Sequence, residues 1–115
     1  MTKIYGIKNC DTMKKAFAWL EDNAVEHNFH DYKKEGANTK ILKQAIADHG
    51  WELVINKRGT TWRKLNKNVQ ESMNDKSAVN IALDNPSIIK RPLLVHNGKT
   101  FLGFKAEEYK NIFNI

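Results

Sequence analysis

The sequence predicts an α/β fold in which one small mixed sheet is built from two halves, with a helical insert between them. Residues 2–32 alternate β-prone and helical patterns, which is typical of a strand–helix–strand unit with parallel strands. Residues 92–104 contain two β-prone runs around Asn97-Gly98, a dipeptide typical of a type I′ hairpin. The segment between these parts, about 38–86, is dominated by helical patterns.

The first half begins with residues 2–7, TKIYGI, a short β-prone run that predicts a buried strand. A helix should follow, because apolar residues recur at the spacing of one helix face. These residues are Met13, Ala16, Phe17, Leu20 and Ala24. Residues 25–32, VEHNFHDY, predict a second strand, and a right-handed crossover would place it parallel to the first.

The insert opens with a helix that carries an apolar stripe and stops at Gly50, in the C′ position. The stripe consists of Ile41, Leu42, Ala45 and Ile46. Residues 51–65 mix apolar and basic residues around Gly59, which predicts a turn with short helical pieces.

Two more helices are predicted before the hairpin. Val69 and Met73 mark a short one. Residues 77–85 mark the other, with Ser77 as its N-cap and Pro86 just past its end.

A last helix is predicted over residues 105–113, after the hairpin. Its apolar side consists of Ala106, Tyr109, Ile112 and Phe113. The element order matches the thioredoxin-like architecture, a four-stranded mixed sheet with a helical insertion between its βαβ and ββα halves. A chain of 115 residues fits one such domain, 1–115, with the insert at about 38–86.

Composition narrows the classes of function. A single cysteine excludes an internal disulfide and a cysteine-rich zinc site. No run resembles a signal peptide or approaches the length of a membrane helix, so we expect a cytoplasmic protein whose thiol stays reduced. The net charge of +6 favours anionic partners or a solvated basic surface. Nucleic acid is not the expected partner, because the cations are scattered and no RNA-binding signature is present.

The single cysteine, Cys10, is predicted to lie at the N-terminus of the first helix, just past the first strand. Free backbone N–H groups and the helix dipole favour a thiolate there, and Lys8 and Lys14 add positive charge. A lone cysteine is often only a small buried apolar residue. The polar neighbours Asn9 and Asp11 favour the reactive thiol instead.

Met13 occupies the position where thioredoxin-like redox sites often carry the second cysteine of a CxxC motif. The chain therefore has no thiol that could resolve a mixed disulfide at Cys10. An external thiol must do so, and glutathione is the expected one.

The sequence resembles the arsenate reductase ArsC/Spx-like family, and most closely its YffB-type branch, whose members are described as glutathione-dependent thiol reductases. The resemblance runs from Tyr5 to about Phe113. The segments that carry it are YGIKNCDTMKKAFAWL, FHDY, GTTWRKL, IIKRPLL and LLVHNGKTFLGF.

The resemblance implies the roles of the site residues. Cys10 would be the catalytic nucleophile, Arg58 and Arg91 would bind the anionic part of the substrate, and Pro92 would be the cis-proline beside the site. Apart from the resemblance, the charge of Lys8 near Cys10 is expected to contribute to the anion site, and Arg63 could either face the site or pack on a helix. A guanidinium suits this role because it presents a planar, permanently charged fork to a carboxylate or oxyanion.

The leading interpretation is a monothiol oxidoreductase with glutathione as co-substrate, an anionic or thiol substrate and no permanently bound cofactor. Arsenate reductase proper is an alternative, weakened because residues 101–104, FLGF, lack the family's third anion-binding arginine. A non-catalytic, Spx-like regulator that binds RNA polymerase is the other. The absence of CxxC counts against redox switching in it but not against binding.

The remaining candidate residues are predicted to be structural. The histidines show no metal-ligand spacing, so no metal site is expected. They are His27, His30, His49 and His96. Trp19, Trp51 and Trp62 are interpreted as packing residues rather than a nucleotide-stacking platform.

Overall fold

A four-stranded mixed sheet is the framework that carries Cys10. Its strands lie in the order β2-β1-β3-β4. They are β1 (Thr2–Gly6), β2 (Asn28–Asp31), β3 (Leu93–His96) and β4 (Lys99–Leu102). β1 pairs in parallel with β2 and antiparallel with β3, which pairs antiparallel with β4. This topology confirms the predicted thioredoxin-like fold.

The computed structural model describes residues 1–115 and divides into two compact units. The sheet unit consists of Met1–Lys33 and Arg91–Ile115, and the helical unit of Lys34–Lys90. The predicted helical insert, about 38–86, falls within the helical unit. That both units form one domain stays a prediction.

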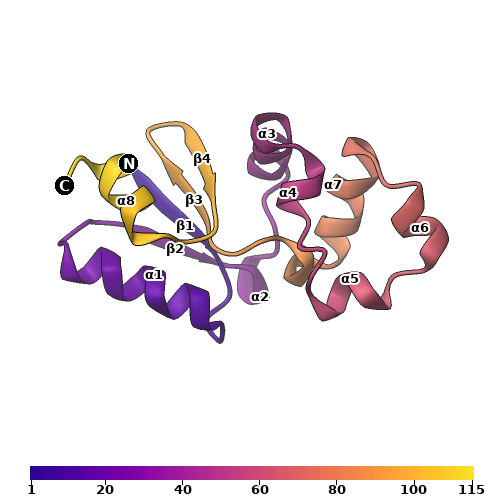
Figure 1. Cartoon of the computed structure of the whole chain (residues 1–115), viewed down its shortest axis with the longest axis horizontal. Helices are drawn as coiled ribbons and strands as arrows, with labels where there is room; N and C mark the ends of the chain where they lie inside the picture. Colours follow the sequence, from indigo (N-terminus) through magenta and orange to yellow (C-terminus); the bar gives the residue numbers. More distant parts are fainter. The chain divides into compact units, whose positions relative to one another are not determined.

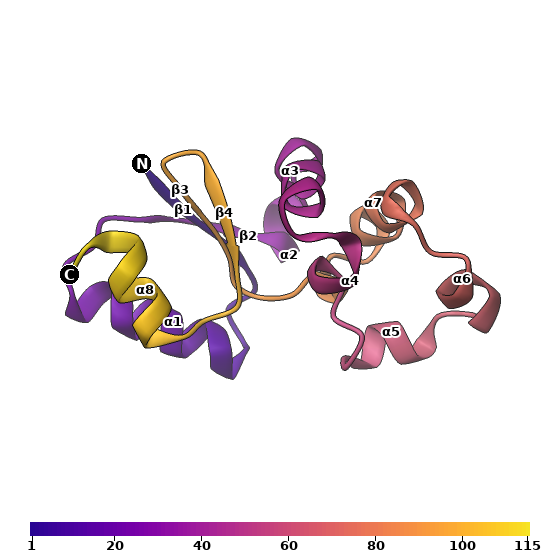
Figure 2. The same cartoon turned by 45° about the horizontal axis from the view of Figure 1, so that its top comes forward.

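Two helices, α1 (Asp11–Asp22) and α8 (Ala106–Phe113), cover the same face of the sheet (Figures 1 and 2). Ile4 and Leu94 are opposite each other in β1 and β3, so both side chains point to this face. They form a fully buried cluster with Met13, Ala16, Leu20 and Tyr109. The predicted apolar faces of both helices therefore meet on the sheet.

The helical unit contains five helices and a 3₁₀ turn. They are α3 (Thr39–His49), α4 (Trp51–Val54), α5 (Thr60–Lys64), α6 (Lys67–Glu71), α7 (Asp75–Asp84) and the turn Pro86–Ile88. Apolar residues of α3 and α7 are buried, and the two helices pack together. An antiparallel bridge between Ile55 and Ile89 ties two distant segments of the unit.

Several predicted boundaries are right. The hairpin loop is Asn97-Gly98 with φ of 49° and 79°, as a type I′ turn requires. Gly50 ends α3 with φ of 86°, where a side chain would be strained. Short helices on both sides of Gly59 agree with the prediction for residues 51–65.

Other boundaries are wrong for local reasons. The second strand covers residues 28–31 and not 25–32, because the Val25 N–H donates to the Leu20 carbonyl as the chain leaves α1, and because α2 begins at Tyr32. Ser77 is not the N-cap of α7. Asn74 is, and it forms a capping box in which its side chain accepts from the Ser77 N–H and the Ser77 Oγ accepts from the Asn74 N–H, both at 2.9 Å.

Two more features of the chain were not predicted or were placed wrongly. Met73 lies beyond the end of α6, although it is buried. A short helix, α2 (Tyr32–Glu35), follows β2 directly, inside the region predicted as strand and loop.

Candidate active site

Cys10 is the N-cap residue of α1, as the sequence predicts. Its backbone is extended, with φ of −149° and ψ of 128°, and its carbonyl accepts the Lys14 N–H at 3.0 Å. The side chain is half-buried against the core beneath α1. The sulfur has no fully formed capping hydrogen bond, but the N–H groups of Thr12 and Met13 lie close enough to favour its ionised form.

The environment of Cys10 favours the thiolate. Burial acts to raise the pKa of the thiol, but the Met13 N–H, a hydrogen bond from the Arg91 side chain, the Thr12 N–H and the Arg91 charge together outweigh it. The pKa of Cys10 is therefore lowered from its ordinary value. A thiol in this state is a better nucleophile at neutral pH than an ordinary cysteine.

Arg91 reaches Cys10 because of the segment that leads into β3. The Arg91–Pro92 peptide bond is cis, which confirms that prediction. Pro92 is buried, and its carbonyl accepts the Gly103 N–H at 2.9 Å, just past the end of β4. β3 lies next to β1 and runs antiparallel to it. A residue just before β3 therefore lies at the same end of the strands as the loop after β1.

Three aromatic residues near this end of the strands were not among the predicted site residues. Tyr5 and His30 lie opposite each other on β1 and β2, with ring centroids 4.8 Å apart, and the His30 and Tyr32 rings are 6.1 Å apart. Burial and the nearby Tyr5 raise the pKa of Tyr32, while the Arg91 charge opposes them. The segment FHDY contains two of the three residues, but no sequence signal assigned them a role.

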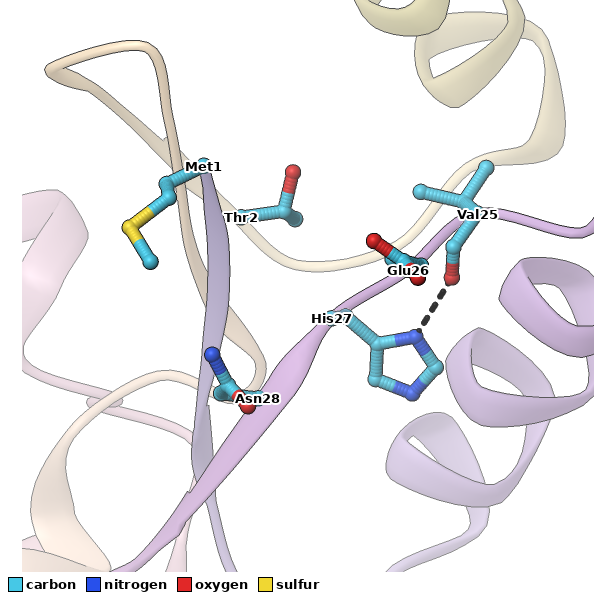
Figure 3. Close-up of a pocket in the computed structure, with 6 residues that line it drawn as sticks. All are labelled: Met1, Thr2, Val25, Glu26, His27 and Asn28. Atoms are coloured by element: carbon cyan, nitrogen blue, oxygen red, sulfur yellow. Dashed lines mark hydrogen bonds between the residues drawn. The ribbon is translucent and has the colours of Figure 1, made fainter.

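A pocket of about 660 Å³ lies at the opposite end of the strands β1 and β2 and is not the candidate site (Figure 3). It is lined by Met1, Thr2, Val25, Glu26, His27 and Asn28, around the first residues of β1 and β2, whereas Cys10 follows the last residue of β1. His27 donates its Nδ1–H to the Val25 carbonyl at 2.8 Å. No thiol or arginine lines this pocket, and nowhere does a cluster of three metal-ligating side chains form.

The GTTWRKL segment has a packing role within the helical unit. The Trp62 ring stacks on Trp51 with centroids 6.4 Å apart, and the Lys57 ammonium lies 4.8 Å from the Trp51 ring centre. The Thr61 and Ser87 hydroxyls are 2.8 Å apart, and the Gln70 amide donates to the Trp62 carbonyl. These contacts support the interpretation of both tryptophans as packing residues.

Comparison with known proteins decides the family. The family model described as "ArsC family" matches residues 5–112. The chain belongs to the ArsC family. The structure of a YffB (PA3664) protein is 43% identical, with a TM-score of 0.94, and the match covers 97% of this chain and 98% of that one. An ArsC-related protein from Brucella melitensis is 46% identical, with a TM-score of 0.76 and coverage of 99% and 95%.

A relative of this chain is described as a transcription regulator rather than a reductase. The global transcriptional regulator Spx of Staphylococcus aureus is 24% identical over 96% of this chain and 85% of its own length. The chain thus has the fold of ArsC-family thiol-based reductases, in their YffB-type branch, and shares it with a transcription regulator. No helix has the length and apolar composition that crossing a membrane requires.

Within this ArsC-family fold the predicted site residues fall into two groups. Cys10, Arg91 and Pro92 come together in the sheet unit. Lys8 is exposed in the same loop as Cys10, and its carbonyl accepts the Cys10 N–H at 3.1 Å, so its backbone helps to shape the loop. Arg58 is exposed in the helical unit, between α4 and α5, and its role at the site stays a prediction.

Proposed function

We propose that this ArsC-family protein is a monothiol reductase that uses Cys10 as its nucleophile and glutathione as its reductant. The observation that carries the proposal is the placement of the Cys10 sulfur at the N-terminus of α1, within hydrogen-bonding reach of the Arg91 side chain. A stabilised thiolate that is half-exposed is what thiol–disulfide exchange requires.

The reaction runs in two exchanges. The Cys10 thiolate attacks the glutathione sulfur of a mixed disulfide between glutathione and a substrate thiol. The sulfur–sulfur bond of the substrate breaks, the substrate leaves as a thiolate that takes up a proton, and glutathione stays disulfide-bonded to Cys10. A second glutathione, as thiolate, then attacks the bound glutathione sulfur. Glutathione disulfide leaves, and the Cys10 thiolate is restored.

The residues around Cys10 support this course. The guanidinium of Arg91 is a suitable partner for the thiolate and for a glutathione carboxylate, because it offers several donors in one plane. Met13 fills the position of a resolving cysteine and is fully buried, so the second exchange depends on an external thiol. Arg58 is the second anion-binding residue of the proposal.

The test is the ionisation and the chemistry of Cys10 in the purified protein. The rate of alkylation by iodoacetamide should follow one ionisation well below about 8.5, the value of an ordinary cysteine. Oxidised glutathione should add one glutathione per chain, as mass spectrometry would show, and Cys10→Ser should abolish the adduct. Reduced glutathione should release it. A thiol that is alkylated only near pH 8.5, or that forms no adduct, contradicts the proposal.

The similarity to Spx supports a second candidate, a binding protein that contacts RNA polymerase. The two functions are separated by a pull-down with the C-terminal domain of the polymerase α-subunit, using the wild type and Cys10→Ser. Binding that is unaffected by the substitution, together with an unreactive Cys10, favours the regulator over the reductase.

A further inference from the structure

A second pocket, of about 520 Å³, lies between β4, the outer strand of the sheet, and α8. The residues that line it come from the hairpin, from β4 and from α8. They include Lys99 and Phe101 of β4 and Glu108 and Ile112 of α8. None of them belongs to the Cys10 loop or to the segment before β3, so this pocket is separate from the candidate active site.

The floor of the pocket is apolar. Phe101 is opposite Leu94 of the buried cluster, so its side chain points to the face of the sheet that α8 covers. Ile112 and Phe113 belong to the last turn of α8, and the Phe113 ring centroid lies 4.6 Å from that of His96. All three apolar residues pack on the core and are only half-buried. Part of their apolar surface is therefore open to a ligand.

His96 lines the same pocket but adds no charge to it. Its Nδ1–H donates to the Thr2 hydroxyl at 2.8 Å, and its Nε2 accepts from the Asn97 amide at 3.2 Å. Burial lowers the pKa of His96, so the ring is neutral at pH 7. The charges of the pocket are therefore those of Lys99 and Glu108.

Lys99 and Glu108 lie toward opposite ends of the pocket. Both side chains are exposed, and neither forms an ion pair. Lys99 lies at the hairpin end, because it is opposite His96, which contacts Phe113. Glu108 precedes Phe113 by five residues, which corresponds to about 7.5 Å along α8 at 1.5 Å per residue. The pocket thus has a cation at one end, a carboxylate toward the other and an apolar floor between them.

We infer that the pocket between β4 and α8 binds a short zwitterionic peptide, of about two residues, that carries an apolar side chain. Lys99 binds the carboxylate of the peptide, Glu108 binds its ammonium group, and the side chain lies on Phe101 and Ile112. Burial of that side chain favours binding, and the two charges fix the direction of the peptide. This inference goes beyond the proposed function and does not depend on Cys10.

The spacing of the two charges selects the length of the ligand. An extended chain spans about 3.3–3.6 Å per residue, so the charged ends of a dipeptide are roughly 7 Å apart. A free amino acid is too short to reach both charges. A segment inside a protein chain has neutral peptide groups where the dipeptide has its charged ends, so the ligand that matches the pocket is a free peptide.

The test is a titration of the isotopically labelled full chain with the dipeptide alanyl-phenylalanine, followed by the amide chemical shifts. We expect saturable shifts in the hairpin, β4 and α8. The analogue with an acetylated N-terminus and an amidated C-terminus keeps both side chains but lacks both charges. It should bind at least about tenfold more weakly, since each charged contact contributes about three- to tenfold at a partly exposed site.

Charge reversal tests the two ends of the pocket. Lys99→Glu and Glu108→Lys each leave two like charges, so each should weaken binding about tenfold. The double variant has one charge of each sign in reversed order, and should bind more tightly than either single variant because the dipeptide can turn around. Lys110→Glu is the matched control and should bind as the wild type does. Lys110 is an exposed residue of α8 that pairs with Glu107 at 4.0 Å and does not line the pocket.

Three outcomes overturn the inference: no shifts in the pocket with millimolar dipeptide, equal affinity for the uncharged analogue, or a double variant that binds no better than the single variants. The chemical shifts also verify the fold of each variant. The alkylation profile of Cys10 should be the same in Lys99→Glu and in the wild type. Failure of this inference therefore leaves the proposed function intact, and an unreactive Cys10 leaves the inference intact.

Discussion

Replacement of Met13 by cysteine should convert the one-thiol site into a two-thiol site. Cys10 is the N-cap of α1 and Met13 is the third residue of the helix, with its N–H directed toward the Cys10 sulfur. Residues three apart on a helix have Cβ atoms about 5–6 Å apart, and side chains point back toward the N-terminus. A small rotation then brings two sulfurs within bonding distance, since disulfides need Cβ atoms about 3.5–4.5 Å apart.

The cost in stability follows from the burial of Met13. The side chain is fully buried in the cluster with Ile4 and Leu94. Replacement of a buried methionine by alanine costs about 2–5 kcal/mol, and a cysteine keeps one of the three heavy atoms that alanine removes. We therefore expect a loss of about 1.5–3 kcal/mol, which a domain with about 5–15 kcal/mol of stability survives.

Mass spectrometry after treatment with oxidised glutathione is the assay. The wild type should keep one glutathione per chain until an external thiol is added. Met13→Cys should instead lose the glutathione at once and accumulate as an internal disulfide. Met13→Ala is the control, because it leaves a similar cavity without a thiol and should keep the adduct. A folded Met13→Cys protein that retains its glutathione would show that the helix N-terminus does not direct residue 13 toward Cys10.

Four further predictions follow from the same geometry. Arg91→Ala should slow alkylation of Cys10 about tenfold at a pH below the ionisation of the thiol. A hydrogen bond to a charged group contributes about 1.5–3 kcal/mol, and the lower end applies because both groups are partly exposed. Arg91→Lys should recover only part of the alkylation rate, and equal rates in the wild type and Arg91→Ala would refute the contact. Because the pKa of Cys10 is lowered on folding, the thiolate stabilises the folded protein at a pH above the pKa of the unfolded thiol. This stabilisation is lost as the pH falls through the pKa of the folded protein. Denaturant titrations should therefore show that Cys10→Ser loses more free energy of unfolding at about pH 9 than at about pH 5. Gly6→Ala should lower the free energy of unfolding by about 1–3 kcal/mol, because an added Cβ would lie 2.5 Å from the Met13 Sδ. The same substitution should lower it less in a Met13→Ala background. Equal losses in both backgrounds would exclude this clash as the cause. Arsenate should be a poor substrate in a coupled assay with glutathione and glutaredoxin. Residues 101–104 lack a third arginine, so transition-state binding should be at least about tenfold weaker than in a site that has one. Efficient turnover of arsenate would refute this prediction.

Local patterns predicted the elements well where one interaction decides the structure. The hairpin at Asn97-Gly98 depends on positive φ at two residues, and the face of α1 depends on helical spacing, so both can be inferred from short segments. Ser77 was placed wrongly because Asn74 and Ser77 can both cap a helix, and their reciprocal hydrogen bonds decide which one begins it. The start of β2 at Asn28 depends on how the chain leaves α1, where the Val25 N–H donates to the Leu20 carbonyl, and no residue type indicates this.

The candidate site was predictable only in part. The position of Cys10 follows from the order of strand and helix, which are neighbours in the sequence. The contact with Arg91 depends on the pairing of β1 with β3, so only the resemblance to a family suggested it in advance. The row of Tyr5, His30 and Tyr32 depends on the register between β1 and β2, and a one-residue slip would point Tyr5 and His30 to opposite faces. Register of this kind is not contained in any single segment.

The sheet unit consists of two separate chain segments, so the surroundings of Cys10 are completed only late in synthesis. Chains emerge from the ribosome N-terminus first, so β1, α1 and Cys10 are made well before β3. The helical unit is continuous in the chain and can begin to fold at this stage. Until Arg91 and β3 have emerged, Cys10 has neither the sheet pairing that orders its loop nor the guanidinium that favours its anion. The nascent protein therefore presents a less acidic cysteine to oxidants, and the full lowering of the Cys10 pKa requires the C-terminal segment that closes the sheet and carries Arg91.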